Sequence, residues 1–156
     1  MTDAPEDFVD VIRCLNAEGC DFVIVGAHAL ASHGVARATG DLDVFVRADE
    51  ANAAKVVRAL TRFGAPLAAH RITERDFATP GTVYQMGLPP RRIDVLTELS
   101  GISFDDAIAD SVVGRIGNEH VRCIGLDAML ANKRASGRPK DLADVAVLEE
   151  IRQRRA

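Results

Sequence analysis

Two acidic side chains at alternate positions form the most informative pattern in the sequence. Asp41 and Asp43 begin the segment DLDVFV, which continues with three apolar residues. If this segment is a strand, residues two apart lie on one face, so both carboxylates project together while Leu42 projects to the other face. Adjacent carboxylates repel each other unless a cation lies between them, and Mg²⁺ prefers such oxygen ligands. The pair therefore predicts a magnesium site, and the alternative is two solvated residues at the start of a strand.

Residues upstream of this pair suit a polyphosphate. Gly26 follows an apolar, β-branched run and precedes a short helical pattern, so its missing side chain lets a phosphate approach free backbone N–H groups. Arg37 and Thr39 alternate immediately before Asp41, and an extended loop would place a guanidinium and a hydroxyl on the same face as that carboxylate. Taken singly, a turn glycine and a surface arginine are the simpler interpretations.

With Gly26 after one strand and the DxD pair on the next, the sequence resembles the polymerase-beta-like nucleotidyltransferase superfamily. It is most similar to the minimal nucleotidyltransferases and to AbiE-type toxins of abortive-infection and toxin–antitoxin systems. The resemblance implies one or two Mg²⁺ ions and transfer of a nucleoside monophosphate from a nucleoside triphosphate (NTP) to an RNA (tRNA, for example) or protein hydroxyl. It also leaves room for an antitoxin partner. Ala27 stands where the family usually has Ser or Gly, so one hydroxyl contact to phosphate is lost while the backbone N–H remains.

The family places a third carboxylate on a neighbouring strand, and Asp94 in the segment RIDVL matches that position. The resemblance therefore makes Asp41, Asp43 and Asp94 the catalytic, metal-binding residues. An acid between two apolar residues of a buried strand is costly unless it is paired or bound to metal. Asp94 could also accept the proton of the attacking hydroxyl in an in-line displacement at the α-phosphate. The alternative is an aspartate held by Arg91 or Arg92.

The segment KRASGRPKDLAD at 133–144 resembles the lysine, basic turn and K/R-D-x-x-D helix start of AbiE-type proteins. This likeness makes Lys133, Lys140 and Asp141 candidate nucleotide-binding residues. Asp141 and Asp144 are neighbours on one helix face near its positive N-terminus, so helix capping is the alternative for both. The basic residues of the segment could meet an RNA backbone.

The elements that must position these residues follow from apolar periodicity. We expect helices at 8–15 (ended by Gly19), 27–32, 50–63 (capped by Asp49), 104–109, 126–134 and 140–152, and strands at 21–25, 41–46, 82–86, 92–96, 112–116 and 120–124. The pattern at 65–80 is too weak to predict an element. The absence of strict βαβ alternation predicts an α/β (α+β) fold, a mixed sheet flanked by helices. One domain is expected over 1–156, with a C-terminal helical segment at about 126–154.

Composition limits the classes of function. The net charge of −4 gives no overall basic field for nucleic acid, and 4% aromatic residues without Trp argue against a base-stacking platform. Cys14, Cys20 and Cys123 lack CxxC spacing, and the four histidines are not spaced for a metal. The acidic start of the chain lacks the apolar stretch of a signal peptide, and no apolar run is long enough to cross a bilayer. We therefore expect a cytoplasmic protein with reduced thiols.

Two other classes of function stay open. The first is a nucleotide-binding or partner-binding protein that has the same fold but no catalytic activity. The alanine at position 27 is compatible with this class. The second is a phosphatase of the haloacid-dehalogenase-like class, which also uses a DxD pair. In that class the pair ends an apolar strand, whereas here the apolar run follows Asp41 and Asp43. This order disfavours the phosphatase.

Overall fold

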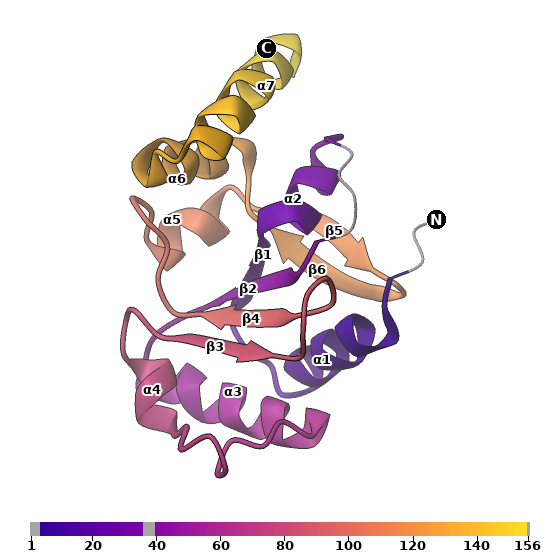
Figure 1. Ribbon diagram of the computed structural model, residues 1–156, viewed down its shortest axis with the longest axis vertical. Helices are drawn as coiled ribbons and strands as arrows, with labels where there is room; N and C mark the ends of the chain where they lie inside the picture. The colour runs from indigo at the N-terminus through magenta and orange to yellow at the C-terminus, as the bar shows by residue number, and fades with distance from the viewer. Residues whose placement is uncertain (1–3, 36–39, 156) are drawn as a thin grey trace.

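A mixed sheet of six strands, counted over the described residues, forms the centre of the molecule in the order β3-β4-β2-β1-β6-β5 (Figure 1). The computed structural model describes residues 4–35 and 40–155. The strands are β1 (Phe22–Val25), β2 (Leu42–Val46), β3 (Val83–Met86), β4 (Ile93–Leu96), β5 (Val112–Ile116) and β6 (Glu119–Cys123). β1 runs antiparallel to β2 and parallel to β6, while β2 runs parallel to β4. β3 and β5 form antiparallel edges on β4 and β6, so the expected mixed sheet is confirmed.

Helices cover both faces of this sheet. They are α1 (Glu6–Ala17), α2 (Gly26–Ser32), α3 (Glu50–Phe63), α4 (Glu74–Ala78), α5 (Phe104–Ala109), α6 (Leu126–Ser136) and α7 (Pro139–Arg155). Figure 1 shows α1, α3 and α4 together on one side of the sheet, and α5 and α6 on the other. α7 leads away from the sheet, and α2 follows directly from the end of β1. Within the described part of the chain, no helix is both long and apolar enough to span a bilayer.

The core lies between the sheet and its helices. α1 buries Phe8, Val11, Ile12 and Leu15, a helical spacing that turns one apolar stripe toward the sheet. All four residues of β1 are buried, as expected for a central strand with both faces covered. The end of β1, where the glycine turn begins, is therefore held on a rigid part of the fold.

Each expected helix and strand is present, with its ends within three residues of the predicted positions. The Asp49 side chain caps α3 by accepting the N–H of Asn52 at 2.7 Å, as predicted. α4 was not predicted, because five residues are too few for apolar periodicity to show. Its sequence signal is a capping box, in which Thr73 and Asp76 satisfy each other's backbone N–H groups.

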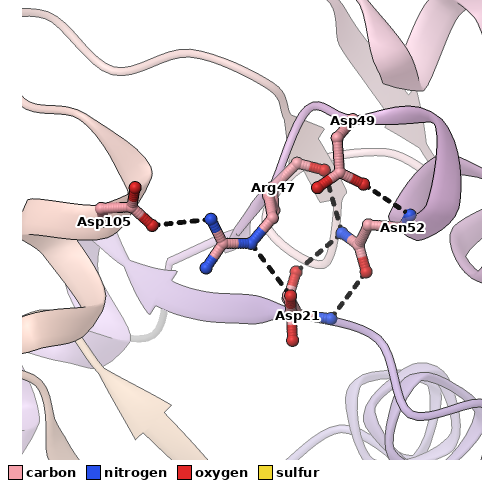
Figure 2. Close-up of polar contacts among 5 residues, drawn as sticks. All are labelled: Asp21, Arg47, Asp49, Asn52 and Asp105. Atoms are coloured by element: carbon pink, nitrogen blue, oxygen red, sulfur yellow. Dashed lines mark hydrogen bonds and ion pairs between the residues drawn. The ribbon is translucent and has the colours of Figure 1, made fainter.

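A polar network at the sheet end away from the DxD pair holds β1, β2, α3 and α5 together (Figure 2). The Asn52 amide oxygen accepts the N–H of Asp21 at 2.7 Å, and its Nδ2 donates to the carbonyls of Asp21 and Arg47. The Arg47 guanidinium pairs with Asp21 at 2.9 Å and with Asp105 at 2.6 Å. These contacts reinforce the register of β1 against β2, in which Val25 lies beside Asp43 at the other end.

Candidate active site

Strand pairing brings the three predicted carboxylates together. β2 and β4 run parallel with Asp43 opposite Asp94, and Asp41 directly precedes β2. Because paired residues on neighbouring strands point to the same side, Asp43 and Asp94 share one face of the sheet. All three acids line a cavity of about 520 Å³, together with Gly26 at the start of α2. The cavity is within the size range of small-molecule sites.

Gly26 makes room for one of these carboxylates. Its backbone has a φ of +72°, and a Cβ placed there would lie 2.2 Å from Oδ2 of Asp43. A side chain would therefore meet both backbone strain and a steric clash. The sequence indicated glycine as an opening for phosphate, and the structure adds that glycine is needed for the Asp43 side chain to occupy its position.

Arg92 holds two of the three carboxylates. Its Nε and Nη2 form a fork on Asp94 at 2.8 and 3.1 Å, and Nη2 also lies 3.3 Å from Oδ2 of Asp41. The backbone N–H of Arg92 donates to Oδ1 of Asp41 at 3.1 Å. Asp94 is only 7% exposed and needs such a partner. The two interpretations of Asp94 are thus compatible, since it lies among the acids and is also paired with arginine.

Asp43 is the least compensated acid of the three. Burial raises its pKa to about 7, and the nearby charges of Asp94 and Asp41 and a hydrogen bond with Asp94 act in the same direction. Arg92 opposes this rise only in part. A carboxyl group with a pKa raised in this way gains from a cation, because positive charge favours its ionised form.

The residues fit a hard divalent cation by their chemistry. Asp41, Asp43 and Asp94 supply carboxylate oxygens from two adjacent strand starts, which is the donor type that Mg²⁺ takes. No three acidic, histidine or cysteine side chains within 4–35 and 40–155 converge as a ready-made metal-binding group. In this structure the guanidinium of Arg92 contacts Asp41 and Asp94.

The corner between α6 and α7 forms another wall of the same cavity. Nζ of Lys133 lies 2.9 Å from Asp144 and 3.5 Å from Asp141, which are 5% and 1% exposed. Arg138 pairs with Asp141 at 2.6 Å, and this hydrogen bond lowers the pKa of Asp141 below its usual value. Lys140 is exposed and also lines the cavity. These acids therefore pair with basic side chains that line the same cavity.

The predicted site residues that the structure describes all line this one cavity: Gly26, Ala27, Asp41, Asp43, Asp94, Lys133, Lys140 and Asp141. Arg37 and Thr39 lie outside the described residues. Sequence reasoning missed the contact of Arg92 with Asp41 and the polar lining residues Glu98, Ser100 and Asn132. The position of Arg92 two residues before Asp94, on the same strand face, indicates its contact with Asp94 but not the contact with Asp41. For the loop after β4, no sequence pattern indicated a role.

A mixed sheet with a glycine turn after β1 and aspartates at the starts of β2 and β4 defines a protein of the nucleotidyltransferase-fold class. The family model for "Nucleotidyl transferase of unknown function (DUF2204)" matches residues 4–156, and the chain belongs to this family. No curated protein matches the chain. The likeness to the nucleotidyltransferase fold is thereby confirmed, while the narrower likeness to AbiE-type toxins stays a prediction.

Proposed function

We propose that this nucleotidyltransferase uses Mg²⁺ to move a nucleoside monophosphate from an NTP to a hydroxyl of an RNA or protein acceptor in the cytoplasm. The observation that carries this proposal is the gathering of Asp41, Asp43 and Asp94 in one cavity beside the turn at Gly26. Carboxylates from two adjacent strands beside the backbone of a glycine turn suit a metal and the phosphates that it binds.

The proposal gives each group a role. Asp41 and Asp43 hold the metal, which when bound stabilises the attacking and leaving oxygens of the displacement. Asp94 completes the ligand set and accepts the proton of the attacking hydroxyl. The backbone N–H groups of Gly26 and Ala27 donate hydrogen bonds to phosphate oxygens, since neither residue has a side chain large enough to cover them. Lys133 and Lys140 supply positive charge on the α6–α7 wall.

The charge of the cavity supports a need for metal. Its described lining contains six acids and four bases: Asp41, Asp43, Asp94, Glu98, Asp141 and Asp144 against Arg92, Lys133, Arg138 and Lys140. A triphosphate is strongly negative, so this acidic surplus would repel it in the absence of a divalent cation. We therefore expect NTP binding to depend on Mg²⁺ even before any chemistry takes place.

Basic side chains near the cavity support an RNA acceptor. Arg138 and Lys140 line the cavity and are exposed, and Arg134 is exposed one turn earlier on α6. Such groups can contact phosphates of an RNA backbone. For a toxin–antitoxin role, we propose that an antitoxin covers the opening of this cavity and blocks access of the acceptor.

A nucleotide-binding protein without turnover is the second candidate. Ala27 favours it, because the nucleotidyltransferases that the sequence resembles usually have Ser or Gly at this position. The phosphatase alternative gains no support, since Asp41 and Asp43 stand at the start of β2 and not at its end.

Calorimetric titration of each NTP with Mg²⁺ tests the proposal. The wild type should bind at least one NTP only with the metal, and Asp41→Asn/Asp43→Asn should lose that binding while its melting temperature falls by no more than a few degrees. Asp106→Asn, an exposed acid on α5, is the matched control and should bind as the wild type does. Unchanged binding by the double variant would overturn the proposed site. Binding without transfer of labelled NMP to any RNA or protein would favour the second candidate.

A further inference from the structure

The guanidinium of Arg92 contacts acids from two neighbouring strands of the sheet. Nε and Nη2 take both oxygens of Asp94, and Nη2 reaches Oδ2 of Asp41. The inference drawn from this contact rests on the proposed function, in which those oxygens belong to the metal site.

The fold places Arg92 there by strand geometry. Residues 92 and 94 are two apart at the start of β4, so their side chains point to the same face. β2 runs parallel to β4, and the N–H of Leu42 donates to the carbonyl of Arg92 at 2.9 Å. This contact aligns Asp41 with Arg92 across the ladder. The planar fork of the guanidinium then matches the two oxygens of the Asp94 carboxylate.

Arg92 and a divalent cation compete for the same oxygens. A carboxylate oxygen has more than one lone pair, but a guanidinium within hydrogen-bond distance places positive charge where the second cation would lie. Asp43 is the member of the three for which no contact with Arg92 is seen among the described residues. The guanidinium of Arg92 thus lies on two of the three proposed ligands.

The Arg92 guanidinium can also reach the open space of the cavity. The Arg92 side chain is 28% exposed and lines the cavity, so it can turn into the open space without disturbing the backbone of β4. A guanidinium binds a phosphate group with the same fork that it uses for a carboxylate. The cavity that receives the metal is the one proposed to hold the triphosphate, so both partners of Arg92 lie within reach of one side chain.

We propose that Arg92 is the internal counter-ion of Asp41 and Asp94 and exchanges partners when metal and nucleotide bind. The guanidinium then moves away from the two carboxylates and binds a phosphate oxygen of the nucleotide. In this role Arg92 weakens the binding of metal alone and strengthens the binding of metal together with nucleotide. Metal without nucleotide is thereby discouraged, since only the polyphosphate offers Arg92 a new anionic partner.

Opposite changes in two affinities test this proposal. The probes are Mn²⁺ alone, followed by electron paramagnetic resonance, and Mn²⁺ with inorganic tripolyphosphate, followed by calorimetry. Arg92→Met should bind Mn²⁺ alone more tightly, on the order of tenfold, and Mn²⁺–tripolyphosphate more weakly by a similar factor. Arg91→Met is the matched control, because Arg91 is the exposed neighbour in the chain, and it should change neither affinity.

Other outcomes would overturn the proposal. Weakening of both affinities in Arg92→Met would make Arg92 a structural support of the carboxylates, and no change in either would make it a bystander. Arg92→Lys serves if the methionine variant unfolds, because a single ammonium cannot span both acids and should shift both affinities in the same directions by smaller factors. In the wild type, the Nε–H resonance of Arg92 should move when tripolyphosphate joins the metal, and an unmoved resonance would contradict the exchange.

Failure of this inference is distinguishable from failure of the proposed function. If Asp41→Asn/Asp43→Asn abolishes metal-dependent binding but Arg92→Met changes nothing, the metal site stands and only the exchange by Arg92 falls. If the wild type and the double asparagine variant bind Mn²⁺ and tripolyphosphate equally, the proposed site falls and the inference falls with it.

Discussion

At the scale of single residues, the main feature of the site is the surroundings of Asp43, which lies in a narrow space and has little positive charge near it. Gly26 leaves room for its carboxyl group, while Asp94 and Asp41 crowd it with like charge. Burial and these neighbours raise the pKa of Asp43 to about 7, so the protonated form predominates below that pH. The position therefore stores an unfavourable free energy above neutral pH that a bound cation would relieve.

The pH dependence of stability should report this group. Because the pKa of Asp43 is raised to about 7 in the folded protein, the folded state holds the proton more tightly than the unfolded state. Its stabilising contribution is complete below about pH 4 and is lost as the pH rises to about 7. Asp43→Asn should remove this loss and be more stable than the wild type at pH 8, by roughly 1–4 kcal/mol. Urea unfolding with a chelator at pH 5 and pH 8 measures it.

Asp106→Asn, on the exposed face of α5, should follow the wild-type pH profile in the same experiment. An Asp43→Asn variant that loses as much stability as the wild type between these two pH values would contradict the role given to this carboxyl group.

Gly26→Ala should damage the site more than an equally strained glycine elsewhere. Gly26 and Gly19 have φ values of +72° and +69°, but a Cβ at Gly19 meets nothing within 4 Å. Backbone strain of about 1–2 kcal/mol applies to both substitutions. Gly26→Ala should lose at least ~1 kcal/mol more, because Asp43 must move, and it should also weaken Mg²⁺-dependent NTP binding. Equal losses in urea unfolding, with binding intact in both variants, would contradict this account.

At the scale of elements, apolar periodicity was enough to predict every described helix and strand except α4. The alternation that places Asp41 and Asp43 on one face, and the Asp49 cap of α3, needed only local rules. The contact between Arg92 and Asp41 could not be predicted, because it depends on β2 and β4 being parallel neighbours. Local patterns identify a strand, whereas its partner in the sheet depends on packing of the whole chain.

In the polar network at the start of α3, substitution of Asn52 should lower stability most (Figure 2). It is 3% exposed and its amide makes three hydrogen bonds to the backbone of Asp21 and Arg47. Asn52→Ala leaves those buried groups unpaired and should lower the free energy of unfolding by about 2–4 kcal/mol. Asp49→Ala removes one capping bond of the same helix and should lower it by about 1 kcal/mol. Urea titration would contradict this ranking if the two losses were equal.

At the scale of the molecule, the cavity joins segments that lie far apart in the chain. Its lining runs from Val25 at the end of β1 to Asp144 on α7. Resemblance indicated that Lys133 and Asp141 belong with the DxD pair, and the structure brings them to one cavity. It also shows what the sequence could not, that Lys133 contacts Asp141 and Asp144, since that depends on how α7 folds back on α6.

Lys133→Met should loosen the α6–α7 wall. The change removes positive charge from two acids that are almost fully buried, and breaking such a pair costs about 3–5 kcal/mol. Lys133→Met/Asp144→Asn should recover at least half of that loss, because it also removes one of the two negative charges that Lys133 contacts. Arg134→Met breaks only a surface pair with Glu149 and should cost less than about 1 kcal/mol. Thermal unfolding of the three variants would contradict this role of the Lys133 ion pairs if the double variant were the least stable.

The parallel pairing of β1 with β6 sets an order of events during protein synthesis. Ile24 pairs with Cys123, so the central strand waits for a neighbour that the ribosome makes later by most of the chain. At about 5–20 residues per second, this interval is roughly 5–20 s. During this interval the DxD pair and then Asp94 are added to the nascent chain, while β6, the neighbour of β1, and the α6–α7 wall have not yet been made. The cavity therefore cannot be complete until every lining residue up to Asp144 has been synthesised.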